Sequence, residues 1–304
     1  MNRRRFVGVL GAGLAGIVVA PTRGLWPASQ ALVERWSWAM GQPVHVMLFA
    51  DSEQQGLDAC ATALAELRRV ENRLTLFDDA SDLSELNRHA GRGAMHVDDD
   101  LRALLERATA FRRLTAGAFD VAVEPLMRAW GFRDPRRTLP SAAELATARE
   151  AVATAEVRLE GASARLPNAH TQLDLGGIGV GYGIDRALAV LRARGIRRAF
   201  VDVSGDCGAI GAPPGESGWL VEIADPNRSK AGTVVAATRL RDTALATSAN
   251  TQSRHVMNPA TGWPAEALRQ VSVVAADAVT ADALSTAMLV CGRRLPGVLW
   301  THLV

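Results

Sequence analysis

The stretch DLGGIGVGYGID, Asp174 to Asp185, decides how the rest of this chain is interpreted. The residues from Thr171 to Leu175 predict a short apolar strand, and apolar residues at helical spacing from Ile184 to Arg194 predict a helix. The predicted joint between them holds four glycines: Gly176, Gly177, Gly179 and Gly181. Glycine lets a phosphate approach the backbone, and a helix N-terminus offers unpaired N–H groups to an anion. A tight turn without a ligand is the competing interpretation of this segment alone.

Composition indicates a folded protein whose partners are small molecules or proteins. The chain has 304 residues, and a hydrophobic content of 48% is ample for a packed core. Its 34 Lys and Arg against 32 Asp and Glu leave a formal charge of +2, and there is a single Tyr. No basic block follows the N-terminus, so the charge pattern of a nucleic-acid-binding protein is missing.

The N-terminal segment has the pattern of an export signal. A basic start, Asn2 to Val7, leads into an uncharged run from Phe6 to Ala20, which is shorter than the ~20 residues that span a bilayer. Arg3 and Arg4, followed by Arg5-Phe6-Val7, fit the twin-arginine pattern. We therefore expect residues 1–30 to be a twin-arginine signal peptide, cleaved between Ala20 and Ala31, and the protein to be periplasmic. A retained membrane anchor and a wrongly assigned start are the alternatives.

The cysteines predict free thiols. Cys60, Cys207 and Cys291 are odd in number and widely spaced, and no CxxC motif is present. Neither a disulfide framework nor a zinc site is implied. We expect all three to be buried, unpaired thiols.

The remaining chain predicts one α+β unit over residues 31–304, with a mainly antiparallel sheet and packed helices. We expect helices over Ser52–Leu74, Asp98–Thr115, Pro140–Thr154 (with Ser141 and Glu144 as a capping box) and Ala278–Val290, and shorter helical pieces at Leu83–Asn87 and within Phe119–Phe132. We expect strands within Val33–Ala50 (two, joined at Gly41-Gln42-Pro43), Glu156–Leu159, Ala164–Leu166, Arg198–Val203, Cys207–Gly211, Gly218–Ile223, Gly232–Leu240, Leu245–Asn250, Arg254–Gly262 and Gln270–Ala275.

Three side chains stand out as candidates for chemistry. Asp282 and Thr286 are four residues apart on a predicted helix, so both oxygens project from one face. Carboxylate and hydroxyl oxygens suit Mg²⁺ or Ca²⁺, although a threonine bonded to its own helix is the competing interpretation. His255 lies in a turn-rich stretch and is a candidate base. We interpret Asp206 as a residue that holds its loop together.

The order of these motifs resembles that of the ApbE family, the FAD:protein FMN transferases, from about Met40 to Gly292. The resemblance passes in sequence through AMGQ, SDLSELN, GAFDVAVEPLMRAWGF, LDLGGIGVGYGID, VDVSGD, ATSAN, HVMNPATGWP and ADALSTAMLVCG. Eight ordered matches are far more specific than any single glycine pattern. The resemblance implies a T-fold-like unit and a Mg²⁺-dependent enzyme. Such an enzyme cuts the pyrophosphate of FAD and joins FMN to a Thr or Ser hydroxyl of an acceptor redox protein, releasing AMP.

The resemblance also implies roles for individual residues. The flavin nucleotide site would be lined by Met40, Phe77, Ala118, Phe119, Asp120, Asp174, Val180 and Met257. The metal would be held by Asp282, Thr286 and the backbone of Gly177, and His255 would be the base for the attacking hydroxyl. A metal and a backbone cradle supply the charge neutralisation and positioning on which phosphoryl transfer depends.

This chain departs from the family pattern at several positions. A Thr is usual where this chain has Gln42, and a Lys or other polar residue is usual where it has Val180. A Gly is usual at the positions of Ser204 and Ala249. Beyond Cys291 the sequence GRRLPGVLWTHLV predicts that an edge strand of the family is missing. Two alternatives therefore remain beside the transferase: a Mg²⁺-dependent FAD pyrophosphatase, in which water replaces the acceptor, and a non-catalytic FAD-binding protein.

Overall fold

The computed structural model describes residues 17–18, 30–134, 138–226, 233–250 and 254–304. Its centre is a seven-stranded sheet in which every pairing is antiparallel, in the order β13-β12-β11-β8-β7-β3-β2. The strands are β2 (Ala31–Ala39), β3 (Gln42–Ala50), β7 (Arg198–Val203), β8 (Asp206–Ile210), β11 (Ala244–Ala249), β12 (Gln270–Ala275) and β13 (Trp300–Leu303). The fold is α+β with a mainly antiparallel sheet, as the sequence predicted.

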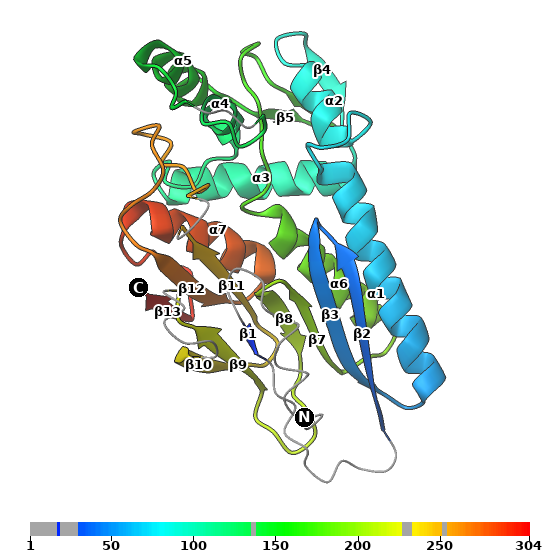
Figure 1. The fold of residues 1–304 in the computed structure, drawn as a ribbon. Coiled ribbons are helices and arrows are strands. Elements are labelled where there is room, and N and C mark those ends of the chain that lie inside the picture. Colours follow the sequence, from blue (N-terminus) through cyan, green and yellow to red (C-terminus); the bar gives the residue numbers. More distant parts are fainter. Residues whose placement is uncertain (1–16, 19–29, 135–137, 227–232, 251–253) are drawn as a thin grey trace.

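Other elements pack on both faces of the large sheet. Helices α1 (Glu53–Leu74), α6 (Gly179–Ala193) and α7 (Ala278–Cys291) pack on one face, as Figure 1 shows. A small sheet of β1 (Ile17–Val18), β9 (Trp219–Ala224) and β10 (Val234–Leu240) covers part of the other. Along β3, Val46 and Leu48 pack among the helices, whereas Met47 and Phe49 pack against Trp219. This alternation follows from the two-residue period of a strand.

A smaller cap of helices gathers at one end of the molecule (Figure 1). It contains α2 (Asp82–Arg88), α3 (Asp99–Leu114), α4 (Glu124–Ala129), α5 (Ala142–Ala153) and a sheet of β4 (Ala94–His96), β6 (Ser163–Arg165) and β5 (Arg158–Glu160). A 3₁₀ turn at Val121–Val123 leads into α4. The predicted capping box of Ser141 and Glu144 is present at the start of α5. The cap matters for function because its 118–133 segment faces the glycine-rich stretch.

The predicted strand at Thr171–Leu175 is wrong. These residues pair with no strand, because the side chain of Asn87 takes the place of one. Its amide nitrogen donates to the carbonyl oxygen of Leu173 at 2.9 Å, and its oxygen accepts from the Leu173 N–H at 2.8 Å. The N–H of Asp174 bonds the carbonyl oxygen of Val121 at 2.7 Å. The following helix begins at Gly179, five residues before the predicted start, so Gly179 and Gly181 lie inside it.

Two further expectations differ from the structure. Arg254–Gly262 is a loop with a single bridge between Met257 and Pro264, since the Asn258 side chain caps a turn there. The edge strand expected to be missing is present as β13, which pairs with β12 from Val271 to Val274. Hydrogen bonding along the β12 edge is therefore completed by the chain's last residues.

The remaining expectations concern thiols and export. Cys60 and Cys207 are buried and unpaired, whereas Cys291 is a free thiol that is only partly buried. Burial raises the pKa of the Cys60 thiol to about 11. The predicted signal peptide lies outside the described residues, except for the two residues of β1 and Gln30. Within the described part of the chain, none of the helices combines the length and apolarity needed to cross a bilayer.

Candidate active site

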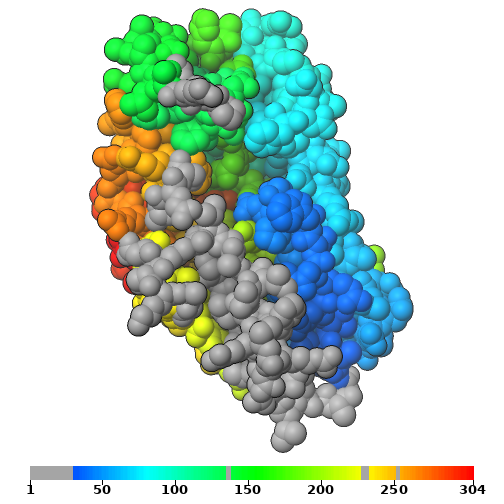
Figure 2. Space-filling view, viewed as in Figure 1, coloured from blue at the N-terminus to red at the C-terminus, as the bar shows by residue number. Residues whose placement is uncertain are grey.

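The residues assigned to the nucleotide, the metal and the base all line one cavity of about 520 Å³. It lies where the β2–β3 hairpin, the end of α1, the 118–133 segment, the glycine-rich stretch, the 255–259 loop and α7 meet. Figure 2 shows the face on which the blue hairpin adjoins the cyan and green parts of the chain. Residues that lie up to 246 positions apart, from Met40 to Thr286, therefore surround a single ligand-sized space.

The glycine-rich stretch and α7 contact each other directly. The N–H of Gly181 donates to a carboxylate oxygen of Asp282 at 3.0 Å. A Cβ atom at Gly181 would overlap the carbonyl oxygen of Ala278, so only glycine lets α6 approach α7 this closely. At Gly177, a Cβ atom would lie 3.3 Å from the hydroxyl oxygen of Thr286. The hydroxyl of Thr286 therefore faces the backbone of Gly177, as the metal assignment requires.

The start of α7 is fixed to α6 by a second contact. The carboxylate of Asp185 accepts the N–H groups of Ala278 and Val279 at 2.9 and 3.0 Å. Asp277 caps the same helix by accepting the N–H of Thr280 at 2.8 Å. Two carboxylates at a helix N-terminus satisfy unpaired donors and suit the helix dipole. The contacts at Asp185 thus help to set the position of Asp282 relative to the glycines.

Asp206 is the acidic residue whose position the sequence interpretation missed. It accepts the N–H of Thr247 at 2.9 Å, which agrees with the expected loop-holding role, but it also lines the cavity. Burial and the nearby Asp282 carboxylate raise the pKa of Asp206 well above its ordinary value. Burial likewise raises the pKa of Asp282, against the hydrogen bond from Gly181. Asp206 is the first residue of β8 and follows the Ser204-Gly205 turn after β7, and this place at a strand end was the sequence signal for a role at the cavity.

The hydroxyl of Thr286 belongs to a chain of hydroxyl groups. Ser248, on β11, lies with its oxygen 3.1 Å from that of Thr286 and 2.7 Å from that of Ser285. Ser285 also donates to the carbonyl oxygen of Asp282 at 2.9 Å. Since Ser285 is fully buried, this chain connects the candidate metal ligands to the interior. Ser248 is a further cavity-lining residue that the sequence did not single out.

The oxygen atoms at this end of the cavity fit a hard divalent cation. Asp282 is 5% exposed and Asp206 lies near it, so the two carboxylates would repel each other in this buried site if both were ionised. A divalent cation would relieve that repulsion, and carboxylate, hydroxyl and carbonyl oxygens are the ligands that Mg²⁺ takes. No trio of His, Cys, Asp or Glu side chains groups as a metal cage in the described ranges. The fit therefore depends on Thr286 and the backbone of Gly177 beside Asp282.

His255 reaches the cavity from the 255–259 loop. Its side chain is exposed to the cavity, yet surrounding protein atoms desolvate it and lower its pKa below the ordinary 6.5. The carboxylate of Asp174 opposes part of this shift. The imidazole is therefore neutral at pH 7 and has the protonation state of a base.

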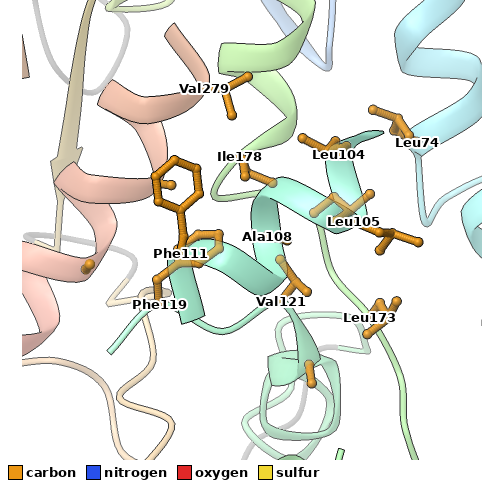
Figure 3. Packing of buried hydrophobic residues seen from close by; sticks show 14 of the residues in the cluster. Leu74, Leu104, Leu105, Ala108, Phe111, Phe119, Val121, Leu173, Ile178 and Val279 are labelled. Atoms are coloured by element: carbon orange, nitrogen blue, oxygen red, sulfur yellow. The ribbon is translucent and has the colours of Figure 1, made fainter. Parts of the chain in front are cut away.

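Apolar side chains also line the cavity. Phe119 is 3% exposed and lies beside Phe111 in Figure 3. The two rings pack edge to face with their centroids 6.1 Å apart. Met257 is 5% exposed, and Phe77 is 83% exposed at the rim. Val180 is half-buried and also lines the cavity. These side chains form a surface suited to a flat aromatic ligand.

Two other segments of the cavity wall are the loop that contains Asp120 and the turn at Met40 and Gly41. Asp120 is 8% exposed; it pairs with Arg112 at 2.8 Å and accepts the N–H of Ala122 at 2.9 Å. Burial still raises the pKa of Asp120. Met40 has a φ of 58° and Gly41 one of 67°, the conformation of a tight hairpin turn. A non-glycine residue at positive φ is strained, which is common at ligand sites.

The fold and the cavity together define the class of protein. It is an α+β protein whose cavity combines a glycine-rich helix start, a set of hard oxygen atoms, an imidazole and apolar side chains. Such a cavity suits a nucleotide that carries both phosphates and a flat aromatic system.

Comparison with known proteins gives the family. The profile of the ApbE family matches residues 40–297, so this chain belongs to the ApbE family. A protein of Treponema pallidum named FAD:protein FMN transferase is 31% identical over 267 residues, which cover 76% of this chain and 73% of that protein. A protein of Vibrio cholerae with the same name is 27% identical, and the alignment covers 79% of this chain and 77% of that protein.

Solved structures agree with the fold. The ApbE protein of Thermotoga maritima superimposes with a TM-score of 0.77 at 29% identity, over 86% of this chain and 88% of that one. The flavin transferase ApbE of Vibrio cholerae has the same TM-score at 22% identity, over 90% of this chain and 97% of that one. The second likeness supports the fold alone.

Proposed function

We propose that this protein is a Mg²⁺-dependent transferase that moves FMN from FAD to a Thr or Ser hydroxyl of an acceptor protein. The observation that carries the proposal is the meeting of Asp282, Thr286 and the Gly177 backbone with His255 around one cavity. Membership of a family whose relatives are named FAD:protein FMN transferases supports flavin transfer as the reaction class.

The proposed step exchanges one phosphoester bond for another. The acceptor hydroxyl oxygen bonds to the phosphorus on the FMN side of FAD, and the bond from that phosphorus to the bridging oxygen breaks. AMP leaves with the bridging oxygen, and the hydroxyl proton passes to neutral His255. A positioned base of this kind typically contributes about 10²–10⁴ in rate.

The remaining residues bind and orient. Asp282, Thr286 and the Gly177 backbone would hold Mg²⁺, which supplies charge neutralisation at the pyrophosphate when bound. Met40, Phe77, Ala118, Phe119, Asp120, Asp174, Val180 and Met257 would line the flavin nucleotide site. At the start of α6 the N–H groups of Gly179 and Gly181 already bond the carbonyl oxygen of Leu175 and the carboxylate of Asp282, so charge neutralisation of the phosphates would depend mainly on the cation.

We also propose where the reaction takes place. The twin-arginine pattern at Arg3 and Arg4 supports export of the folded protein to the periplasm. The acceptor would then be a redox protein exposed on that side of the membrane. Twin-arginine export of an already folded protein fits a chain whose described cysteines are unpaired.

Incubation of the purified protein with FAD, Mg²⁺ and an acceptor peptide tests the proposal. We expect AMP release in equal amount to a peptide that carries FMN. AMP and free FMN with an unmodified peptide would instead identify a pyrophosphatase. FAD that stays intact and bound would identify a non-catalytic flavin-binding protein.

A further inference from the structure

Arg133 joins three parts of the cavity wall that are far apart in sequence. Its guanidinium group donates to both oxygens of Glu124 at 2.8 and 3.1 Å, and it pairs with the carboxylate of Asp174. The same group lies over the ring of Phe77, 5.5 Å from the ring centre. Asp174 and Phe77 are residues of the proposed flavin site. Arg133 lines the same cavity but has no role in that proposal.

The contacts of Arg133 are those of a built network. Glu124 is completely buried, and the side chain of Arg133 is 15% exposed. Burial raises the pKa of Glu124, the hydrogen bond from Arg133 opposes this, and the charge of Asp174 adds to it. Without the guanidinium group, the carboxylate of Asp174 in the cavity wall and the buried carboxylate of Glu124 would repel each other. The planar guanidinium group can pair with both oxygens of Glu124 and still donate to Asp174, whereas a lysine ammonium lacks the fork for the bidentate pair.

The cation–ring contact has a specific consequence for Phe77. This ring is 83% exposed, so few neighbouring atoms hold it in place. A guanidinium group over the face of an aromatic ring attracts it and limits its motion. Asp174 is held from two sides: one carboxylate oxygen pairs with Arg133, and the other accepts the N–H of Gly176 at 2.7 Å.

We infer that Arg133 is a positioning residue for FAD, which fixes the Phe77 ring and the Asp174 carboxylate in the arrangement that receives the flavin nucleotide. The inference rests on the proposed function only in that FAD is the ligand. It does not depend on whether the protein transfers FMN, hydrolyses FAD or merely binds it.

Arg128 provides a matched control. It also pairs with Glu124, at 3.0 Å, but its side chain is 57% exposed and it does not line the cavity. Replacement of Arg128 thus disturbs the same buried carboxylate without touching Phe77 or Asp174. A comparison of the two arginines separates an effect on the cavity wall from a general effect on the fold.

The test measures association of FAD by stopped-flow flavin fluorescence with Mg²⁺ and no acceptor, which resolves binding before any bond is cut. We expect Arg133→Gln to raise the Kd for FAD by about 10-fold, the loss typical of a charge-assisted contact. Arg133→Lys should recover part of that loss, and Arg128→Gln should stay within about 2-fold of the parent. If Arg128→Gln weakens binding as much as Arg133→Gln, or neither does, the inference is wrong.

A double-mutant cycle distinguishes positioning from direct contact with FAD. In a protein that already carries Phe77→Leu and Asp174→Ala, Arg133→Gln should change the Kd by less than about 2-fold, because the ring and the carboxylate that Arg133 positions are gone. The same loss in both backgrounds would show that Arg133 acts on FAD directly and would overturn the inference. Arg133→Gln alone leaves the buried carboxylate of Glu124 without this partner, which could destabilise the fold. The same cycle can therefore also be run with Glu124→Gln present in every variant, so that this buried charge is absent throughout.

Discussion

The N–H of Gly181 donates a hydrogen bond of 3.0 Å to the carboxylate of Asp282, which joins the glycine-rich start of α6 to the middle of α7. This single contact brings together the two elements on which the proposed chemistry depends. It leaves the carboxylate 5% exposed at the edge of the cavity, with Thr286 one helical turn further along.

Gly181→Ala should therefore damage both stability and the cation site. The added methyl group overlaps the carbonyl oxygen of Ala278 and forces α6 and α7 apart, at a cost of about 2 kcal/mol. Urea unfolding and the Mg²⁺ dependence of AMP release measure the two effects. Gly179→Ala is the control, since its nearest neighbour would lie 4.0 Å away. Equal stability of the two variants would contradict the close contact of the helices.

The pH dependence of turnover tests the role of His255. Because burial lowers its pKa below 6.5, the rate at saturating FAD should fall only when the pH drops below that lowered value. Asp174→Asn removes the carboxylate that raises the pKa, so the acid limb of the profile should move to lower pH. His255→Ala should lose about 10²–10⁴ in rate and abolish the limb. An unchanged limb in His255→Ala would assign it to another group.

Asp202 makes stability depend on pH away from the cavity. Burial raises its pKa from 3.8 to about 6, against a hydrogen bond from Gly205 and the charge of His45. Its contribution to stability is complete below pH 3.8 and is lost as the pH rises through 6, by about 3 kcal/mol at most.

Asp202→Asn should remove that dependence, since an amide oxygen still accepts the N–H of Gly205. Urea unfolding from about pH 3.5 to about pH 7 should show a flatter dependence of stability on pH for the variant. Asp242→Asn is the control, because Asp242 accepts the N–H of Gly211 in the same manner at an exposed position. A variant curve as steep as the parent's would refute the assignment.

Local patterns in the sequence predicted most of the fold. The alternation from Val33 to Ala50 predicted β2 and β3, and the capping residues Ser52, Asp98 and Ser141 marked helix starts that the structure contains. The error at Thr171–Leu175 has a physical cause. Backbone pairing by the side chain of Asn87, 86 residues away, is a tertiary contact that a local apolar pattern does not reveal.

The same distinction applies to the site. Asp282 and Thr286 share a helix face, so their spacing predicted that they act together. Asp206 and Arg133 come from other segments, and their neighbours in space are Asp282 and Asp174. Such partners are set by the packing of whole elements, which sequence spacing does not encode.

The most direct test of the account is a Mg²⁺ titration of FMN transfer by the parent protein and by Asp282→Asn, with intact mass of the acceptor as the readout. We expect the parent to add FMN to the acceptor, with loss of water, in a saturable Mg²⁺-dependent manner. The variant should bind FAD and remain folded, since removal of a buried charge relieves repulsion with Asp206, yet it should transfer nothing at any Mg²⁺ concentration. Transfer by Asp282→Asn with the parent's Mg²⁺ dependence would contradict the account.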